Sequence, residues 1–337
     1  MKIIKWLCSS LSAYWMRAAR ACIALFFFLM MPAVLAESIL VQGGKVFTLG
    51  EAGTLEKADI LIRNGRVDQI GADLSGASVD RVINAVGKVV TPGLWAPISG
   101  LGLTEISAAT TTNDGAVADL NVGAAFDPVP AYNPLSTLIP SNRAGGITRA
   151  VVMPTSEEKV FAGNGFAIVL NGEFDSVTNP SVAQRIYLGE YGGELAGGTR
   201  ANAFSQVKKA LAQATEYAEN KAAIRRGEWR DLDFSVQDLE ALQPLLRGEQ
   251  PVVISANRAS DILQVLALAD AFNLKLIIEG ASEGWMVADQ LASAQVPVIL
   301  DVLRNSPDAF ERLGARLDNA ARLHKAGVRI LLTGAGY

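Results

Sequence analysis

The sequence is poor in cysteine and histidine, two of the side chains that most often hold metal ions. It contains two cysteines, Cys8 and Cys22, and one histidine, His324, among 337 residues. Both cysteines lie within the first 36 residues, so the rest of the chain can form no disulfide and has no thiol nucleophile or cysteine ligand. A single histidine cannot build a histidine-rich metal site.

Positive charge is also scarce. The chain has 30 basic and 34 acidic residues, and the first 36 residues hold four of the basic ones and no acid. The remainder therefore carries 26 basic against 34 acidic residues, a net charge of −8. Phosphate binding needs a basic surface, and the pair Arg225-Arg226 is interpreted as a solvated helix end. The sequence predicts no nucleic-acid partner.

The first 36 residues have the layout of a secretory signal peptide. Basic residues precede the apolar run 21–36, which ends in small side chains at Ala36. We expect cleavage after Ala36, export to the periplasm and no membrane association afterwards. One alternative is an uncleaved anchor, which Pro32 and a run shorter than the ~20 residues needed to span a bilayer disfavour. Lipid attachment at Cys22 is a second alternative, but Arg20 interrupts the apolar run that should precede it.

Residues 37–90 show the alternation of apolar and polar side chains that is typical of β-strands. The runs ESILVQGGKVFTL and ADILIRNGRVDQIG both follow this pattern. The pair Asn64-Gly65 between two such runs is typical of a two-residue hairpin turn. We therefore predict a small N-terminal β-sandwich module at 37–90.

From residue 91 onward, short apolar runs alternate with segments of helical periodicity. The clearest runs are 251–256, 274–280, 296–302 and 328–334, and earlier runs at 147–155 and 165–172 also predict strands. The four later runs repeat at roughly 22 to 31 residues, which fits a strand plus a crossover helix. Strands that are apolar on both faces indicate a parallel sheet covered by helices. A helical insertion is predicted at 200–247. We predict an α/β domain at 91–337, either a barrel or an open sheet, that ends at about its eighth strand.

Three stretches resemble a known family: ILVQGGKVFTL, ADILIRNGRVDQIG and VINAVGKVVTPGL. They look like the lead-in of the amidohydrolase superfamily, in its exported imidazolonepropionase-like branch, and the likeness continues to HKAGVRILLTG. The resemblance implies a (β/α)₈ TIM-type barrel, apparently incomplete at its C-terminus, beside a β-sandwich that later strands complete. It also implies hydrolysis of C–N bonds other than peptide bonds. Zinc or another divalent ion would lower the pKa of a bound water to about 7.

The metal ligands that the resemblance implies are not found at the matching positions. Those positions are Ile98 and Gly100 for the His-x-His pair, Ser255 or Asn257 for the histidine of strand five, Gly280 or Ala281 for that of strand six, and Gly334 or Ala335 for the aspartate of strand eight. None of these side chains is a usual zinc ligand. His324 precedes the last strand, at the opposite end of the barrel, and is interpreted as structural.

These observations leave three interpretations open. The first is an exported amidohydrolase-like protein without a metal centre or other cofactor. It would bind a small molecule or a partner protein, with Ser255 and Asn257 as candidate binding residues, and could form an oligomer. The second is an active hydrolase with an oxygen-only site, for which Glu105, Glu279 and Asp301 are the candidates, with or without magnesium or calcium. These acids can equally be solvated residues at strand ends. The third is a truncated, non-functional fragment.

Overall fold

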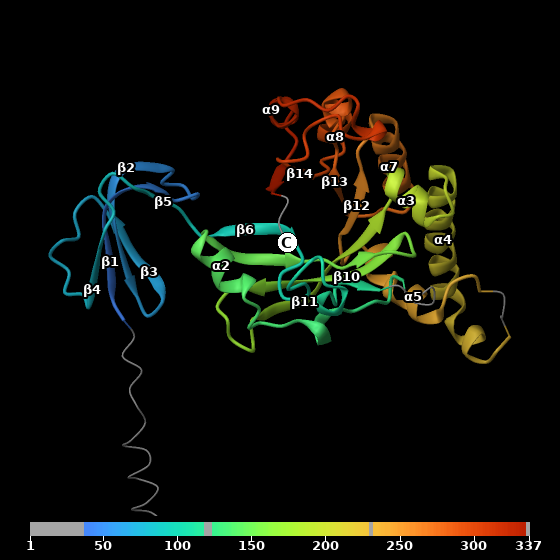
Figure 1. The fold of residues 1–337 in the computed structure, drawn as a ribbon, viewed down its shortest axis with the longest axis horizontal. Helices are drawn as coiled ribbons and strands as arrows, with labels where there is room; N and C mark the ends of the chain where they lie inside the picture. Colours follow the sequence, from blue (N-terminus) through green and yellow to red (C-terminus); the bar gives the residue numbers. More distant parts are fainter. Residues whose placement is uncertain (1–36, 118–122, 229–231, 335–337) are drawn as a thin grey trace, which may run out of the picture. The chain divides into compact units, whose positions relative to one another are not determined.

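The computed structural model describes residues 37–117, 123–228 and 232–334. The predicted signal peptide at 1–36 lies outside this range. The chain divides into two compact units, Met1–Pro92 and Gly93–Tyr337, which are described separately (Figure 1). In the described part of the chain, no helix is both long enough and apolar enough to cross a membrane.

The described residues of the first unit form one five-stranded sheet. Its strands are β1 (Ile39–Phe47), β2 (Thr54–Arg63), β3 (Arg66–Gly71), β4 (Arg81–Asn84) and β5 (Val89–Val90). The order is β3-β2-β1-β4, and β5 also pairs with β1. Asn64 and Gly65 both have positive φ, 54° and 71°, as the predicted hairpin between β2 and β3 requires. The hairpin is confirmed, whereas the predicted β-sandwich, which needs a second facing sheet, is not.

The second unit is built around an eight-stranded sheet that is nearly closed into a barrel. The order is β15-β14-β13-β12-β11-β10-β8-β6, and the first and last of these strands lie close together. Its strands are β6 (Leu94–Ser99), β8 (Ile147–Val152), β10 (Phe161–Val169), β11 (Val177–Tyr187), β12 (Val252–Ala256), β13 (Leu276–Gly280), β14 (Val298–Asp301) and β15 (Ile330–Thr333). The four apolar runs predicted as strands after residue 250 are confirmed as β12 to β15. A separate two-stranded pair joins β7 (Ala116–Val117) to β9 (Thr155–Ser156).

The first half of the barrel departs from the regular (β/α)₈ repeat that the resemblance implies. Strand β10 is antiparallel to both of its neighbours, β8 and β11, whereas the other pairings in this sheet are parallel. The reason lies in the connections, because the segments 153–160 and 170–176 on either side of β10 contain no helix. Such short links can form hairpins but cannot cross over to a parallel strand.

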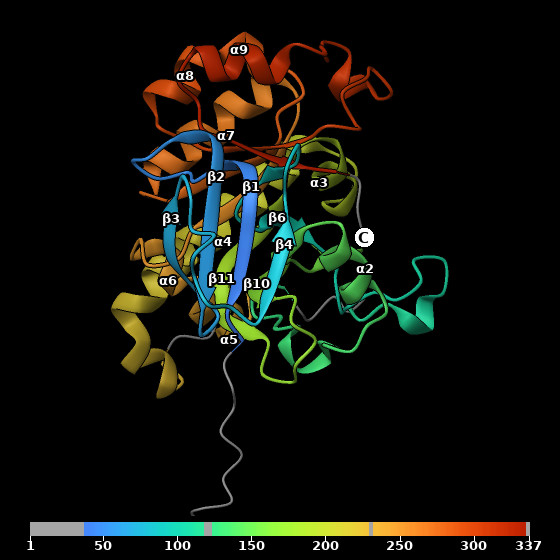
Figure 2. The ribbon, with the colours of Figure 1, turned by 90° about the vertical axis from the view of Figure 1, so that its left-hand side faces the viewer.

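Helices follow the later strands. Between β11 and β12 the chain forms α3 (Gly189–Leu195), α4 (Arg200–Arg225), α5 (Val236–Ala241) and α6 (Gln243–Leu246), which confirms the predicted helical insertion. The later helices are α7 (Ala259–Ala271), α8 (Ala288–Ser293) and α9 (Asn319–Lys325), and α2 (Leu138–Ala144) precedes β8. Helices α7, α8 and α9 lie on the outer side of the β12–β15 strands (Figures 1 and 2).

The barrel interior is set by the two-residue period of the strands. Alternate residues of β12, β13 and β14 face outward and pack against the helices, as Ile254, Ile278 and Val298 do. Their neighbours Val253, Ile277 and Ile299 meet in a second apolar cluster together with residues from β6, β8 and β11. A cluster that draws on strands from both halves of the sheet is the filled interior of the barrel. Side chains two positions further along each strand therefore point to the same interior, one layer nearer the carboxyl ends.

Candidate functional site

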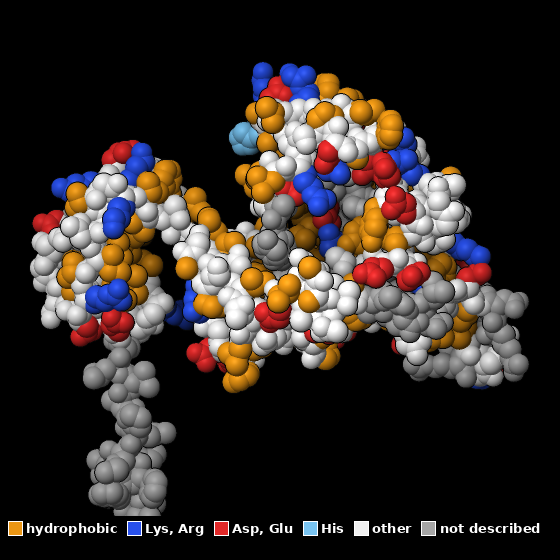
Figure 3. Space-filling view, in the orientation of Figure 1, with side chains coloured by type: hydrophobic (Ala, Val, Ile, Leu, Met, Phe, Trp, Pro, Cys, Tyr) orange, Lys and Arg blue, Asp and Glu red, His pale blue; other side chains and the backbone are white. Residues whose placement is uncertain are grey.

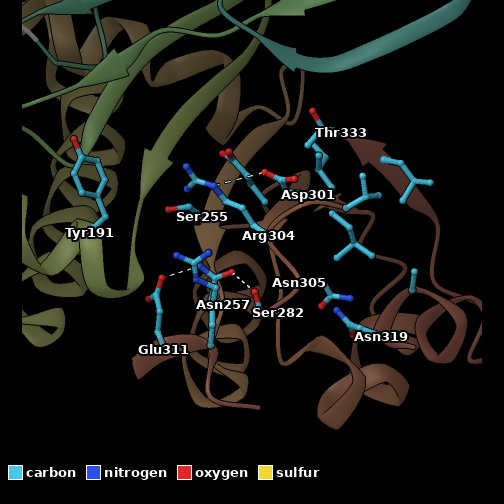
Figure 4. Close-up of a pocket in the computed structure, with 18 of the residues that line it drawn as sticks. Tyr191, Ser255, Asn257, Ser282, Asp301, Arg304, Asn305, Glu311, Asn319 and Thr333 are labelled. Carbon is cyan, nitrogen blue, oxygen red and sulfur yellow. Dashed lines mark hydrogen bonds and ion pairs between the residues drawn. The ribbon is translucent and has the colours of Figure 1, made fainter. Parts of the chain in front are cut away.

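The carboxyl ends of the parallel strands surround a cavity of about 660 Å³ (Figure 4). Its volume falls in the range typical of small-molecule sites. The strand ends contribute Arg185, Tyr187, Ser255, Asn257, Glu279, Asp301 and Thr333, and the loop after β14 contributes Arg304, Asn305, Glu311 and Arg312. In the space-filling view, acidic and basic side chains lie next to one another around a hollow in the larger unit (Figure 3). The carboxyl end of the barrel is where the sites of this architecture form.

Arg185 and Glu279 form the central ion pair of the cavity wall. The guanidinium donates through Nε to Glu279 Oε2 at 3.0 Å and through Nη2 to Oε1 at 2.5 Å. Its Nη1 donates to the carbonyl of Pro154 at 3.2 Å. Burial lowers the pKa of Arg185, but the charge and hydrogen bonds of Glu279, together with Tyr187 and Tyr191, outweigh it and raise this pKa above its ordinary value. The Arg185 guanidinium therefore stays charged, and it occupies both oxygens of the Glu279 carboxylate.

Two tyrosines extend this wall. The Arg185 guanidinium lies 4.9 Å from the centre of the Tyr187 ring, and Tyr187 meets Tyr191 edge to face at 4.9 Å. Tyr191 donates its hydroxyl hydrogen to the Ser156 carbonyl at 2.6 Å. Burial raises the pKa of Tyr187 to about 12, so its phenol is neutral at physiological pH. The Tyr187 hydroxyl has no hydrogen-bond partner in the described part of the chain and remains available to a ligand.

A second group of polar side chains lies beyond β12 and β13. Ser282 donates to Asn257 Oδ1 at 2.9 Å, and Asn257 Nδ2 donates to Glu311 Oε1 at 2.7 Å (Figure 4). The other Glu311 oxygen accepts the backbone N–H of Glu190 at 2.7 Å. Glu311 therefore fastens the loop after β14 to the loops after β11 and β12. The Ser255 hydroxyl lies 3.3 Å from both the N–H and the carbonyl oxygen of Leu188, so it links two strands.

The structure brings four of the five predicted site residues together. Ser255, Asn257, Glu279 and Asp301 all line the cavity. Glu105 is not among the residues that line it. Its carboxylate instead accepts hydrogen bonds from Asn133 Nδ2 at 2.9 Å and Ser136 Oγ at 2.8 Å, which ties together the long segment between β6 and β8.

The described residues do not fit the divalent-metal site that the resemblance implies. Among them, no three or more His, Cys, Asp or Glu side chains gather where they could hold a metal ion. Ile98 packs into the apolar barrel interior. Gly280 has a φ of +100°, a backbone conformation that other residues rarely adopt, and a Cβ atom there would lie 2.5 Å from Asn257 Oδ1, so that Asn257 would have to move. Ala335 lies outside the described residues, and His324 is exposed in α9 and does not line the cavity.

Sequence reasoning misses Arg185, Tyr187, Ser282 and Glu311. A signal for Ser282 was present, because residues 280–284 read GASEG and have the spacing G-x-S-x-G, directly after a strand. In the structure its hydroxyl bonds to Asn257, not to a histidine, and the positive φ of 46° falls on Ala281. The motif spacing therefore marks a cavity residue, without the base that a serine nucleophile needs.

Comparisons with known proteins give a fold and one short sequence match. No known protein-family model matches the chain. It is 45% identical over 56 residues to a 5-methylthioadenosine/S-adenosylhomocysteine deaminase from Thermococcus sibiricus, which is 17% of this chain and 13% of the relative. An amidohydrolase from Thermotoga maritima has a similar structure, with a TM-score of 0.76 at 23% identity over 88% of this chain and 78% of that one. The chain therefore shares its fold with an amidohydrolase. A triazine hydrolase variant is a more distant structural neighbour, with a TM-score of 0.46 at 16% identity over 89% of this chain and 72% of that one.

Proposed function

We propose that this chain is an exported member of the amidohydrolase superfamily, in its imidazolonepropionase-like branch. Its cavity would bind a small molecule without the metal centre of the family. The shared fold supports the family assignment, and so does the 45% identity over 56 residues to a deaminase. Export rests on the predicted signal peptide.

The observation that carries the proposal is the pairing of Glu279 with Arg185. Glu279 stands at the end of β13, where a carboxylate could serve as a metal ligand. Both of its oxygens already accept hydrogen bonds from the guanidinium of Arg185, which is 8% exposed. A divalent ion would have to displace this cation and leave it buried and unpaired, which costs about 3–5 kcal/mol. The protein thus supplies its own positive charge to this carboxylate.

The other cavity acids are also engaged within the protein. Glu311 accepts hydrogen bonds through both oxygens, and Asp301 accepts the N–H of Leu303 at 2.9 Å. Apart from one Asp301 oxygen, the polar groups left to a ligand are hydroxyl, amide and guanidinium groups, and apolar side chains such as Ile299 and Leu332 lie beside them. Such a lining suits recognition of a small polar molecule better than activation of a metal-bound water.

Metal content tests this proposal. The full chain, purified from the compartment to which it is exported, is incubated with zinc, manganese, magnesium and calcium, desalted and measured by mass spectrometry. We expect well below one equivalent of any ion. Retention of one equivalent that Glu279→Ala or Asp301→Ala abolishes would refute the metal-free site. Glu105→Ala is the matched control, because this acid lies outside the cavity.

A further inference from the structure

The charged groups of the cavity differ in how fully the protein satisfies them. Glu279 is bound by Arg185 at both oxygens. Glu311 is bound by Asn257 and by a backbone N–H, and Arg200 Nη2 lies 3.6 Å from it. These two carboxylates therefore have little capacity left for a ligand.

Two arginines of the loop after β14 are, in contrast, only partly satisfied by hydrogen bonds and ion pairs. Arg304 has one ion-pair contact, from its Nε to Asp301 Oδ2 at 3.8 Å, which is too long for a hydrogen bond, and its side chain is 67% exposed. Arg312 pairs through Nη1 with Asp308 at 3.2 Å, and its Nε is buried with no hydrogen-bond partner in the described residues. Both residues line the cavity, and each keeps guanidinium donors without an acceptor among the described residues.

Neutral donors complete this lining. Tyr187 and Asn305 both line the cavity, and neither side chain has a hydrogen-bond partner within the ranges that the structure describes. Asp301 has a 3.8 Å ion-pair contact with Arg304, which lies beside it (Figure 4). The unsatisfied groups of the wall are therefore mainly hydrogen-bond donors, and two of them carry positive charge.

We propose that the cavity binds a small organic anion, through a carboxylate or phosphate group held by Arg304 with Arg312 nearby. This inference rests on the proposed small-molecule role of the same cavity and names the chemical class of its ligand. A guanidinium can bind both oxygens of such a group with two parallel hydrogen bonds, the strongest arrangement open to it. A bound anion would draw Arg304 away from Asp301, so that Asp301 competes with the ligand.

The test is calorimetric titration of the full chain with succinate and with inorganic phosphate, at low ionic strength. Arg304→Gln is expected to weaken binding of the preferred anion by about tenfold or more. Asp301→Asn is expected to strengthen it, because the competing carboxylate is removed. Arg329→Gln is the matched control, since this exposed arginine precedes β15 at the opposite end of the strand and does not line the cavity.

Neutral succinamide separates this inference from the proposed function. Binding of succinamide as tight as that of succinate would overturn the anion class while leaving a small-molecule site in place. Equal loss of succinate binding in Arg304→Gln and Arg329→Gln would assign the effect to surface charge and also overturn it. If neither succinate nor phosphate binds, the anion proposal is overturned too. Retention of a metal ion in the mass-spectrometry experiment would instead contradict only the proposed metal-free site.

Discussion

Replacing Arg185 by methionine is expected to destabilise the larger unit by about 3 kcal/mol. Methionine preserves an unbranched apolar stem beside Tyr187 but removes the donors to Glu279 and to the Pro154 carbonyl. Breaking a buried ion pair by deleting one partner costs about 3–5 kcal/mol. The Arg185 side chain is 10% exposed and that of Glu279 is 23% exposed, so water can partly solvate the abandoned carboxylate. This places the expected loss at the lower end of the range.

A second substitution tests the sign of this reasoning. In the double variant Arg185→Met with Glu279→Met, no charge is left without a partner, and two apolar side chains fill a similar volume. The double variant should therefore be more stable than the single Arg185→Met variant, by about 1–2 kcal/mol. Arg226→Met is the matched control. Arg226 forms the same two-bond pair with Glu228, at 2.6 and 2.7 Å, but on the exposed surface, where such pairs contribute little.

The assay is urea unfolding followed by tryptophan fluorescence. Every tryptophan beyond residue 36 lies in the larger unit, so the signal reports the unfolding of that unit. The reasoning is refuted if Arg185→Met costs no more than Arg226→Met, or if the double variant is less stable than the single one. Either result would mean that the ion pair does not hold the strand ends together.

Three further predictions follow from single side chains. Burial raises the pKa of Tyr187 from 10.0 to about 12, so the stability that its neutral phenol contributes is complete below pH 10 and is lost as the pH rises toward 12. Between pH 9 and pH 11, the free energy of unfolding measured in urea should therefore fall by about 1 kcal/mol less in Tyr187→Phe than in the native chain. An equal fall in both proteins would contradict the burial of the phenol. Gly165→Ala should lower the free energy of unfolding by about 2 kcal/mol, because the added Cβ would collide with Met153 Sδ inside the barrel. An unchanged urea midpoint would show that the Met153 side chain can move aside. Glu311→Ala should speed amide hydrogen exchange in residues 302–318, since two anchors of that loop are lost, and unchanged protection would mean that other contacts hold it.

The second half of the barrel is predictable from the sequence, and so in part are β8 and β10, whereas β11 is not. Each of β12 to β15 is a short apolar run with a segment of helical periodicity before or after it. This alternation is typical of a parallel sheet covered by helices. The run Asn179-Pro180-Ser181 inside β11 instead resembles a loop, because proline cannot donate to a sheet. The structure accommodates it where the pairing of β10 with β11 shifts register, between Ala167 opposite Asn179 and Gly165 opposite Ala183. A missing donor costs little at such an irregularity, and only tertiary pairing reveals it.

The candidate site could be predicted only where its residues end strands that the sequence makes recognisable. Ser255, Glu279 and Asp301 were accessible to sequence reasoning because they end recognisable parallel strands, whose carboxyl ends must meet. Glu105 follows a strand too, but its hydrogen bonds to Asn133 and Ser136 hold it in a loop beside the barrel, and nothing local in the sequence encodes that.

Arg185 pairs with the acid Glu279 and so determines what that acid can bind. Sequence reasoning missed Arg185 because it did not predict β11, the strand that carries it. With β11 known, the two-residue period places Ala183, Arg185 and Tyr187 on the interior face, one above the other. The guanidinium then reaches Glu279 across 94 positions of sequence. An acid at a strand end looks the same in the sequence whether it binds a metal, a substrate or an arginine. Its role is fixed by inward-facing residues of other strands, here Arg185 of β11, which lies two strands away from β13 in the sheet. An acid in a parallel barrel should therefore be interpreted together with the inward residues of all the strands around it.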